Sequence, residues 1–450
     1  MSSLWFRSAL LPNGWFNNVR ITLEDGLISF IETDAAAHAD DEHHAVAIPG
    51  LPNLHSHAFQ RGMAGLAEVR GPTGDSFWTW REVMYRFLDR MSPDDMQAIA
   101  AQAYIEMLES GFTRVGEFHY VHHDIDGAPY SDLGELAGRM AAAASETGIA
   151  LTLLPVFYAH GGFGAAASGH GQRRFLNDVD RFGHLMEASG RAIAPLPDAV
   201  LGLAPHSLRA ATAEEINEIV PMTDGPIHIH VAEQTKEVDD CLAWCGRRPV
   251  DRLYDTAPVD PRWCLVHATH VTDAERIRIA ESGAIVGLCP ITEANLGDGI
   301  FPADSFAAAG GRFGVGSDSN VLIEAAEELR TLEYGQRLWR RARNVMASQE
   351  GAATGRTLFD AVLNGGTMAL GASSALATGS PADIVSLNVR HPALEARNLD
   401  ALLNAWIFAS RGSAIDCVWR RGEKLVANGH HRARERVEAS FRTALSNVLA

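Results

Sequence analysis

The sequence has few of the residues on which several classes of protein depend. Its 450 residues include five cysteines, and these have none of the spacings of a disulfide framework: Cys241, Cys245, Cys264, Cys289 and Cys417. No apolar run reaches the roughly 18 residues that a membrane span needs. The first residues, MSSLWFRSALLPNGWF, lack the charged segment, apolar run and cleavage site of a signal peptide. We therefore expect a cytoplasmic protein that does not enter a membrane.

Positive charge is also scarce. The chain has 38 Lys and Arg against 56 Asp and Glu, for a formal charge of -18, and Lys236 and Lys424 are its only lysines. Nonspecific nucleic-acid binding needs clustered Lys and Arg, so this balance argues against a nucleic-acid partner. An acidic chain can still bind an acidic small molecule where local arginines define the pocket.

Eight short apolar runs, separated by helix-length segments, predict buried parallel strands in βα units. They cover residues 46–57, 113–120, 150–158, 200–207, 227–233, 264–270, 284–290 and 313–319. Among the segments between them, DDMQAIAAQAYIEMLESG (94–111) predicts a helix, because its first turn is acidic and a glycine ends it. Eight such units predict an α/β fold of the (β/α)₈ TIM-barrel type, whose chemistry lies at the carboxyl ends of the strands.

Both ends of the chain follow a different pattern. Residues 1–45, 379–389 and 414–429 alternate apolar residues with turn signals, which predicts short strands outside the barrel. We expect both termini to form a small β-sandwich, with residues 1–47 and 378–450 as its two parts, the second ending in a helix, and residues 48–377 as the barrel. The long connection after the first barrel strand contains FWTWREVMYRF (77–87), and long connections at an active-site rim are commonly lids or subunit contacts.

Metal-ligating residues lie at the ends of three predicted strands. His55 and His57 end the first strand, His230 the fifth and Asp318 the eighth. Side chains at i and i+2 share a strand face, so both histidines of the first strand can point inward. Imidazole nitrogen and carboxylate oxygen suit Zn²⁺ with a position open for water, although Fe²⁺ and Mn²⁺ accept the same ligands. The alternative for each histidine alone is a strand-end hydrogen bond, as we expect for His228 deeper in the fold.

Two further groups are suited to proton transfer. Glu233 lies three residues beyond His230, and His267 ends the sixth strand. A carboxyl group beside a metal can pass a proton to a leaving nitrogen, and an imidazole can stabilise a tetrahedral oxygen. The alternative for Glu233 is a solvated charge at the rim.

In combination, these motifs resemble the amidohydrolase superfamily, in its mononuclear deaminase branch, over about residues 46 to 377. The motifs are His-x-His after the first strand, His-x-x-Glu at the fifth, His at the sixth and GSDS at the eighth. Longer stretches resemble the formimidoylglutamate deiminase family: LPNLHSHAFQRGMAGLAE, GEFHYVHHD, APHSLRA, IHIHVAEQ, CPITEANLGDGIF and GSDSNVLIEAAEELRTLEYGQRL. Many related barrels bridge two metals with a carboxylated lysine from a middle strand, and neither lysine here lies on one.

The resemblance implies a hydrolase of linear amidines that converts N-formimino-L-glutamate to N-formyl-L-glutamate and ammonia in histidine degradation. It implies one Zn²⁺ per subunit on His55, His57, His230 and Asp318, and a homodimer. Asp318 would receive the proton of the attacking water, Glu233 would help to protonate the leaving nitrogen, and His267 would steady the tetrahedral intermediate.

The substrate would be a small dianion derived from an amino acid, and its two carboxylates call for arginine and hydrogen-bond donors. The resemblance assigns substrate binding to Gln60, Tyr120, His206 and Arg209, and suggests Arg81, either within its own subunit or across a dimer interface. Two alternatives stay open. A guanine or cytosine deaminase of the same branch would want aromatic stacking and amide contacts instead, and a non-catalytic barrel scaffold could dispense with the metal ligands.

Overall fold

The structure is a computed structural model that describes residues 2–71, 76–411 and 414–450. Residues 1, 72–75 and 412–413, which belong to the predicted N-terminal, barrel and C-terminal regions, lie outside the described residues. None of the helices in the described ranges is long and apolar enough to cross a membrane.

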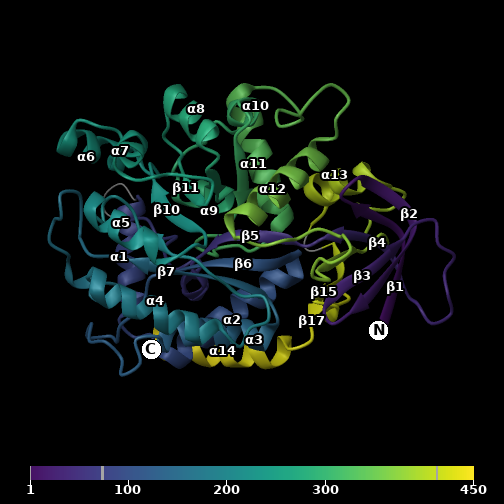
Figure 1. Cartoon of the computed structure of the whole chain (residues 1–450), viewed down its shortest axis with the longest axis horizontal. Helices are drawn as coiled ribbons and strands as arrows, with labels where there is room; N and C mark the ends of the chain where they lie inside the picture. The colour runs from purple at the N-terminus through teal and green to yellow at the C-terminus, as the bar shows by residue number, and fades with distance from the viewer. Residues whose placement is uncertain (1, 72–75, 412–413) are drawn as a thin grey trace.

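Two parallel sheets lie at the centre of the larger part of the molecule (Figure 1). The first contains β5 (Leu51–Ser56), β6 (Phe112–His119), β7 (Ala150–Phe157) and β8 (Val200–Leu201), with β9 (Ala204–Pro205) also paired to β7; the second contains β10 (Ile227–Val231), β11 (Trp263–His267), β12 (Ile285–Leu288) and β13 (Arg312–Val315). Neighbouring strands follow one another in the sequence, which confirms the prediction of a parallel α/β fold. Single bridges join the two sheets on both sides: Ser56 to Asp318, Leu203 to Ile227 and Ser207 to His230.

Glycines divide two of the predicted strands. The run 46–57 contains the end of β4 (Glu42–Pro49), which belongs to another sheet, and then β5. The chain changes sheet at Gly50, where a Cβ atom would lie 2.2 Å from the side chain of Thr113. The run 200–207 is divided at Gly202 into β8 and β9, and a Cβ atom there would lie 2.4 Å from the carbonyl oxygen of Pro226. Only glycine allows these close approaches, and the single-strand predictions for both runs were wrong.

Helices connect the parallel strands and lie outside them (Figure 1). The predicted helix over 94–111 is α2, whose N-cap Ser92 and Asp95 exchange hydrogen bonds and whose C-cap Gly111 is left-handed, with φ 100°. The α-helices are α1 (Phe77–Leu88), α2 (Pro93–Ser110), α3 (Glu135–Thr147), α4 (Val179–Ile193), α5 (Ala213–Ile219), α6 (Thr235–Cys245), α7 (Pro249–Thr256), α8 (Asp273–Ser282), α9 (Pro290–Leu296), α10 (Ala303–Ala308), α11 (Ala325–Arg340), α12 (Thr354–Ala369), α13 (Asp400–Ala409) and α14 (Arg434–Leu449). Short 3₁₀ turns are η1 (Ala58–Met63), η2 (His170–Gln172) and η3 (Val220–Met222).

Strands from both ends of the chain form one eight-stranded sheet, where the purple and yellow segments of Figure 1 lie side by side. Its order is β17-β16-β15-β14-β4-β1-β2-β3. The strands not yet given are β1 (Ser2–Leu11), β2 (Gly14–Glu24), β3 (Leu27–Glu32), β14 (Ile384–Leu387), β15 (Ile415–Arg420), β16 (Glu423–Ala427) and β17 (His430–His431). The two termini are joined because β4 pairs with β1 in parallel and with β14 in antiparallel orientation.

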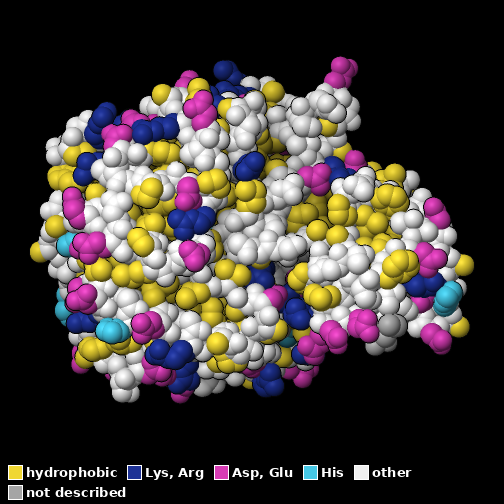
Figure 2. Space-filling view, in the orientation of Figure 1, with side chains coloured by type: hydrophobic (Ala, Val, Ile, Leu, Met, Phe, Trp, Pro, Cys, Tyr) yellow, Lys and Arg dark blue, Asp and Glu magenta, His cyan; other side chains and the backbone are white. Residues whose placement is uncertain are grey.

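A buried ion network connects this terminal sheet to the parallel strands. Arg114 of β6 lies 3.0 Å from the carboxylate of Asp198, which also accepts from Arg420 of β15 at 2.8 Å. Arg420 forms a further ion pair with Asp383. Elsewhere, charges of both signs are interspersed over the face drawn in Figure 2.

Candidate metal centre and active site

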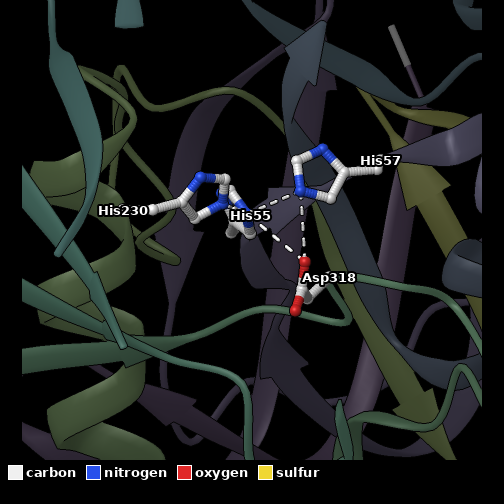
Figure 3. A group of neighbouring side chains, drawn as sticks. All are labelled: His55, His57, His230 and Asp318. Atoms are coloured by element: carbon white, nitrogen blue, oxygen red, sulfur yellow. Dashed lines mark hydrogen bonds and ion pairs between the residues drawn. The ribbon is translucent and has the colours of Figure 1, made fainter. Parts of the chain in front are cut away.

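Four side chains from distant segments converge at the carboxyl ends of the parallel strands (Figure 3). His55 comes from β5, His57 from the residue after it, His230 from β10 and Asp318 from the loop after β13. All four are buried, and one possible ligand atom from each lies within 4.8 Å of the others. These are the four residues that the sequence predicts as metal ligands.

The hydrogen bonds of the histidines leave their inner nitrogens facing one another. His57 Nδ1 lies 3.0 Å from the carbonyl oxygen of Phe118, and His230 Nδ1 lies 3.2 Å from that of His206. Because a carbonyl only accepts, both Nδ1 atoms carry hydrogen and both Nε2 atoms carry lone pairs. These Nε2 atoms lie 3.2 and 3.0 Å from Nε2 of His55. In the neutral rings, the Nε2 lone pairs of His57 and His230 are therefore available to a cation.

The separations fit a metal ion. Asp318 Oδ1 lies 3.4 Å from Nε2 of His55 and 3.2 Å from Nε2 of His57. Ligands at about 2.0 to 2.1 Å from a tetrahedral Zn²⁺ are about 3.3 Å apart, and the donor set of three imidazoles and a carboxylate is one that zinc accepts. The residues present therefore suit a single divalent metal.

Backbone hydrogen bonds and a polar network hold the ends of β5 and β13 together. Asp318 N–H donates to the carbonyl of His55 at 2.9 Å, and His57 N–H donates to the carbonyl of Asp318 at 2.9 Å. Asn320 donates to the carbonyls of His57 and Asp318 at 3.0 and 3.1 Å. Asp318 itself has φ 45°, in the left-handed region that aspartate adopts more readily than most residues with a Cβ atom. The metal-facing carboxylate is thus fixed in advance.

Glu233 and His267, the predicted proton-transfer residues, lie beside this group. His267 Nε2 is 3.8 Å from Glu233 and 3.9 Å from Asp318, and its Nδ1 is 3.3 Å from Glu293. Burial raises the pKa of Glu233 above its ordinary value. Burial alone would lower the pKa of His267, but the carboxylates of Glu233, Glu293 and Asp318 raise it to about 10. His267 therefore has a carboxylate near each of its ring nitrogens.

The five residues predicted to bind substrate all line one pocket. This pocket lies over the group formed by His55, His57, His230 and Asp318. This pocket has about 560 Å³ of space, counting its open mouth, and its lining includes Gln60, Arg81, Tyr120, His206 and Arg209. Gln60 donates to the hydroxyl of Tyr120 at 2.8 Å. Arg81 lines the pocket of its own chain, so an interface is not needed to bring it there.

Among the described residues, the buried Nε atoms of Arg81 and Arg209 have no hydrogen-bond partner. Both Arg81 and Arg209 lie over the ring of Trp78, at 4.6 and 5.8 Å from its centroid. Arg209 is also 3.8 Å from Glu233. Two cations with unused donors in one pocket suit a ligand that carries negative charge.

Other sequence-based expectations concern residues away from the pocket. His228 is buried and its Nε2 lies 2.7 Å from the carbonyl oxygen of Ala369, as expected of a histidine in the core. Lys236 belongs to α6, where it pairs with Asp240, and Lys424 belongs to β16, where it pairs with Glu42. Neither lysine lies on a parallel strand, so neither can bridge two metals at the strand ends.

Sequence reasoning missed several residues of the pocket. One is Tyr158, the residue after β7, which the rule of strand-end residues could have identified. The others come chiefly from α1, in the long connection that was noted only for its length: Phe77, Trp80, Met84 and Tyr85. Their spacing carries no signal for a ligand, because a helix with this pattern could equally pack in the core.

Comparisons with known proteins agree with this geometry. The amidohydrolase family matches residues 46–425, and the family described as "Formimidoylglutamate deiminase HutF, N-terminal domain" matches residues 1–45. A formimidoylglutamate deiminase of Pseudomonas aeruginosa is 51% identical, and the match covers 100% of both chains.

Two solved structures are similar over the whole chain. An amidohydrolase from Brucella melitensis is 55% identical with a TM-score of 0.97, and the match covers 100% of both chains. An adenosine deaminase from Xanthomonas campestris, described with bound zinc, is 21% identical with a TM-score of 0.81, over 99% of this chain and 98% of that one. The second similarity concerns the fold alone. The chain therefore belongs to the amidohydrolase family and, within it, to the formimidoylglutamate deiminases.

Proposed function

We propose that this protein hydrolyses the formimino C=N bond of N-formimino-L-glutamate, with N-formyl-L-glutamate and ammonia as products, in histidine degradation. The full-length similarity to a formimidoylglutamate deiminase supports this reaction. The observation that carries it is one pocket that combines four converging metal-type ligands, a carboxyl and imidazole pair and two guanidinium groups.

His55, His57, His230 and Asp318 would hold a divalent ion. When bound, the ion would lower the pKa of water and so supply the nucleophile near neutrality. Oδ1 of Asp318 faces His55 and His57, whereas its second oxygen, Oδ2, lies 3.9 Å from Nε2 of His267. This oxygen would accept the proton that the attacking water loses. Zinc is our proposal for the native metal, and the same ligands accept Fe²⁺ and Mn²⁺.

Glu233 and His267 would act on the leaving nitrogen and on the oxygen of the tetrahedral carbon, respectively. Glu233 is buried beside the reacting position and would give a proton to the nitrogen that leaves as ammonia. His267 has carboxylates near both ring nitrogens, so it would keep both N–H groups and donate a hydrogen bond to the oxygen of the tetrahedral carbon.

The substrate carboxylates would be bound by Arg81 and Arg209, with Gln60, Tyr120 and His206 as further donors. Arg209 is the deeper of the two cations and is 8% exposed. Planar guanidinium groups match carboxylates through paired hydrogen bonds, which an aromatic base would not use. The aromatic side chains of Phe77, Trp80 and Tyr85 favour the alternative of a guanine or cytosine deaminase, but that substrate would leave both guanidinium groups without an anion.

The proposal extends to the assembly and the regions of the chain. We infer that the two parallel sheets close into one (β/α)₈ barrel, which the bridges on both sides support. We also infer that the terminal sheet folds over itself as a β-sandwich, since one buried cluster includes Ile28 of β3 and Trp419 of β15. The regions would be residues 1–47, 48–377 and 378–450. A cytoplasmic homodimer completes the proposal.

Ammonia release from purified protein tests the function. N-formimino-L-glutamate, guanine and cytosine are supplied separately, and N-formyl-L-glutamate is identified as the product of the first. Turnover of only the bases would refute the substrate assignment, whereas a protein that neither binds metal nor releases ammonia would be the non-catalytic scaffold.

A further inference from the structure

Helices α5, α6 and α8 each follow a parallel strand and carry a glutamate as the third residue of the helix. In α5 the carboxylate of Glu215 accepts the backbone N–H of the N-cap Thr212 at 2.7 Å, and in α8 that of Glu275 accepts the N–H of the N-cap Thr272 at 2.8 Å. Both are ordinary capping boxes, in which the threonine hydroxyl accepts from the glutamate N–H in return.

The glutamate of α6 differs. Its N-cap residue is Gln234, whose side chain makes no capping hydrogen bond, and the carboxylate of Glu237 reaches past it. Oε1 accepts the N–H of Ala232 at 3.2 Å and Oε2 accepts the N–H of Glu233 at 3.1 Å. Glu237 is 1% exposed, so its carboxylate is buried behind the pocket rather than at the surface of the helix.

The backbone that Glu237 contacts is strained. Ala232 has φ 52°, and a left-handed conformation is unfavourable for a residue with a Cβ atom. Such a conformation persists only where neighbouring contacts hold it. This turn directs the side chain of Glu233 toward His267. The two consecutive N–H groups of the turn donate to the carboxylate of Glu237.

We propose that Glu237 is a positioning residue for the reaction, which holds Glu233 in its reactive orientation through the backbone of residues 232 and 233. This rests on the proposed function. A displacement of about 1 Å at a reacting group can reduce turnover by 10²-fold, so loss of these two hydrogen bonds reduces kcat even though Glu237 does not touch substrate.

The test compares Glu237→Gln with Glu275→Gln, the same substitution at the equally buried capping glutamate of α8, which lies away from the pocket. We expect kcat on N-formimino-L-glutamate, expressed per metal-loaded enzyme, to fall about 10-fold to 100-fold in the first variant. KM should change little, because Glu237 does not line the pocket. In Glu275→Gln, kcat and KM should stay within about twofold of the wild type while the melting temperature falls.

Glu237→Asp is a second variant that tests the same hydrogen bonds. It keeps the charge but is one methylene shorter, so it loses the hydrogen bonds to residues 232 and 233; kcat should fall with little change in KM. A kcat within about twofold of wild type in both Glu237 variants would overturn the proposal, as would failure of both to fold, since the role would then be structural. A wild-type protein that releases no ammonia from N-formimino-L-glutamate would contradict the proposed function instead.

Discussion

Replacement of Arg209 by alanine should weaken the protein's action on its dianionic substrate without affecting the metal. Arg209 is buried in the pocket, its Nε has no hydrogen-bond partner among the described residues, and its nearest anion is Glu233 at 3.8 Å. Two charge-assisted hydrogen bonds to a substrate carboxylate contribute about 1.5 kcal/mol each at least. Their loss, about 3 kcal/mol, corresponds to a roughly 150-fold fall in kcat/KM.

The assay is steady-state ammonia release, with metal content measured on the same samples. Analogues that lack one carboxylate provide the control: the N-formimino derivatives of 4-aminobutyrate and of norvaline. The analogue that lacks the group bound by Arg209 should be a poor substrate for the wild type and no poorer for the variant. If Arg209→Ala retains kcat/KM within about threefold on the dianion, another cation binds the carboxylate and the reasoning fails.

Three other changes test separate parts of the structure. Asp318→Asn should abolish turnover and reduce bound metal; a near-normal kcat would remove Asp318 from the mechanism. Asp383→Ala breaks the buried network with Arg420 and should lower the unfolding free energy by about 3 to 5 kcal/mol in urea titrations, while kcat per folded enzyme is unchanged; a loss below about 1 kcal/mol would contradict this. Burial lowers the pKa of His119 in the folded protein to about 3. As the pH falls below about 6.5, this imidazole is therefore protonated in the unfolded chain but not in the folded protein. Wild-type stability should then decrease by about 2 kcal/mol at pH 5 relative to neutrality through this group, and an equal slope in His119→Gln would refute it.

The strand ends were predictable because the physical pattern is local. A buried parallel strand is short and apolar, and a polar residue within a few positions of its end, such as His57 or Asp318, lies at the carboxyl end of the sheet. The four candidate metal ligands and the pair of Glu233 and His267 could therefore be predicted from four separate segments of the sequence. The helix α2 was likewise visible, since its acidic first turn and final glycine are adjacent in sequence.

Features that depend on contacts between segments could not be predicted. The division of the first strand at Gly50 follows from the side chain of Thr113, which lies 63 positions along the chain. Trp78 and Tyr85 belong to a helix that covers the pocket only because α1 packs beside η1 and η2. Glu237 resembles an ordinary capping residue in the sequence, and only the hydrogen bonds to Ala232 and Glu233 distinguish it from Glu275.

Activity measured as a function of bound metal tests the central claim most directly. Metal-free protein is prepared with a chelator, zinc is returned in steps, and both the bound metal and the ammonia released from N-formimino-L-glutamate are measured at each step. The account predicts no turnover without metal and activity that rises linearly to a maximum at about one equivalent per chain. Turnover by the metal-free protein, or a maximum only at two equivalents, would contradict it.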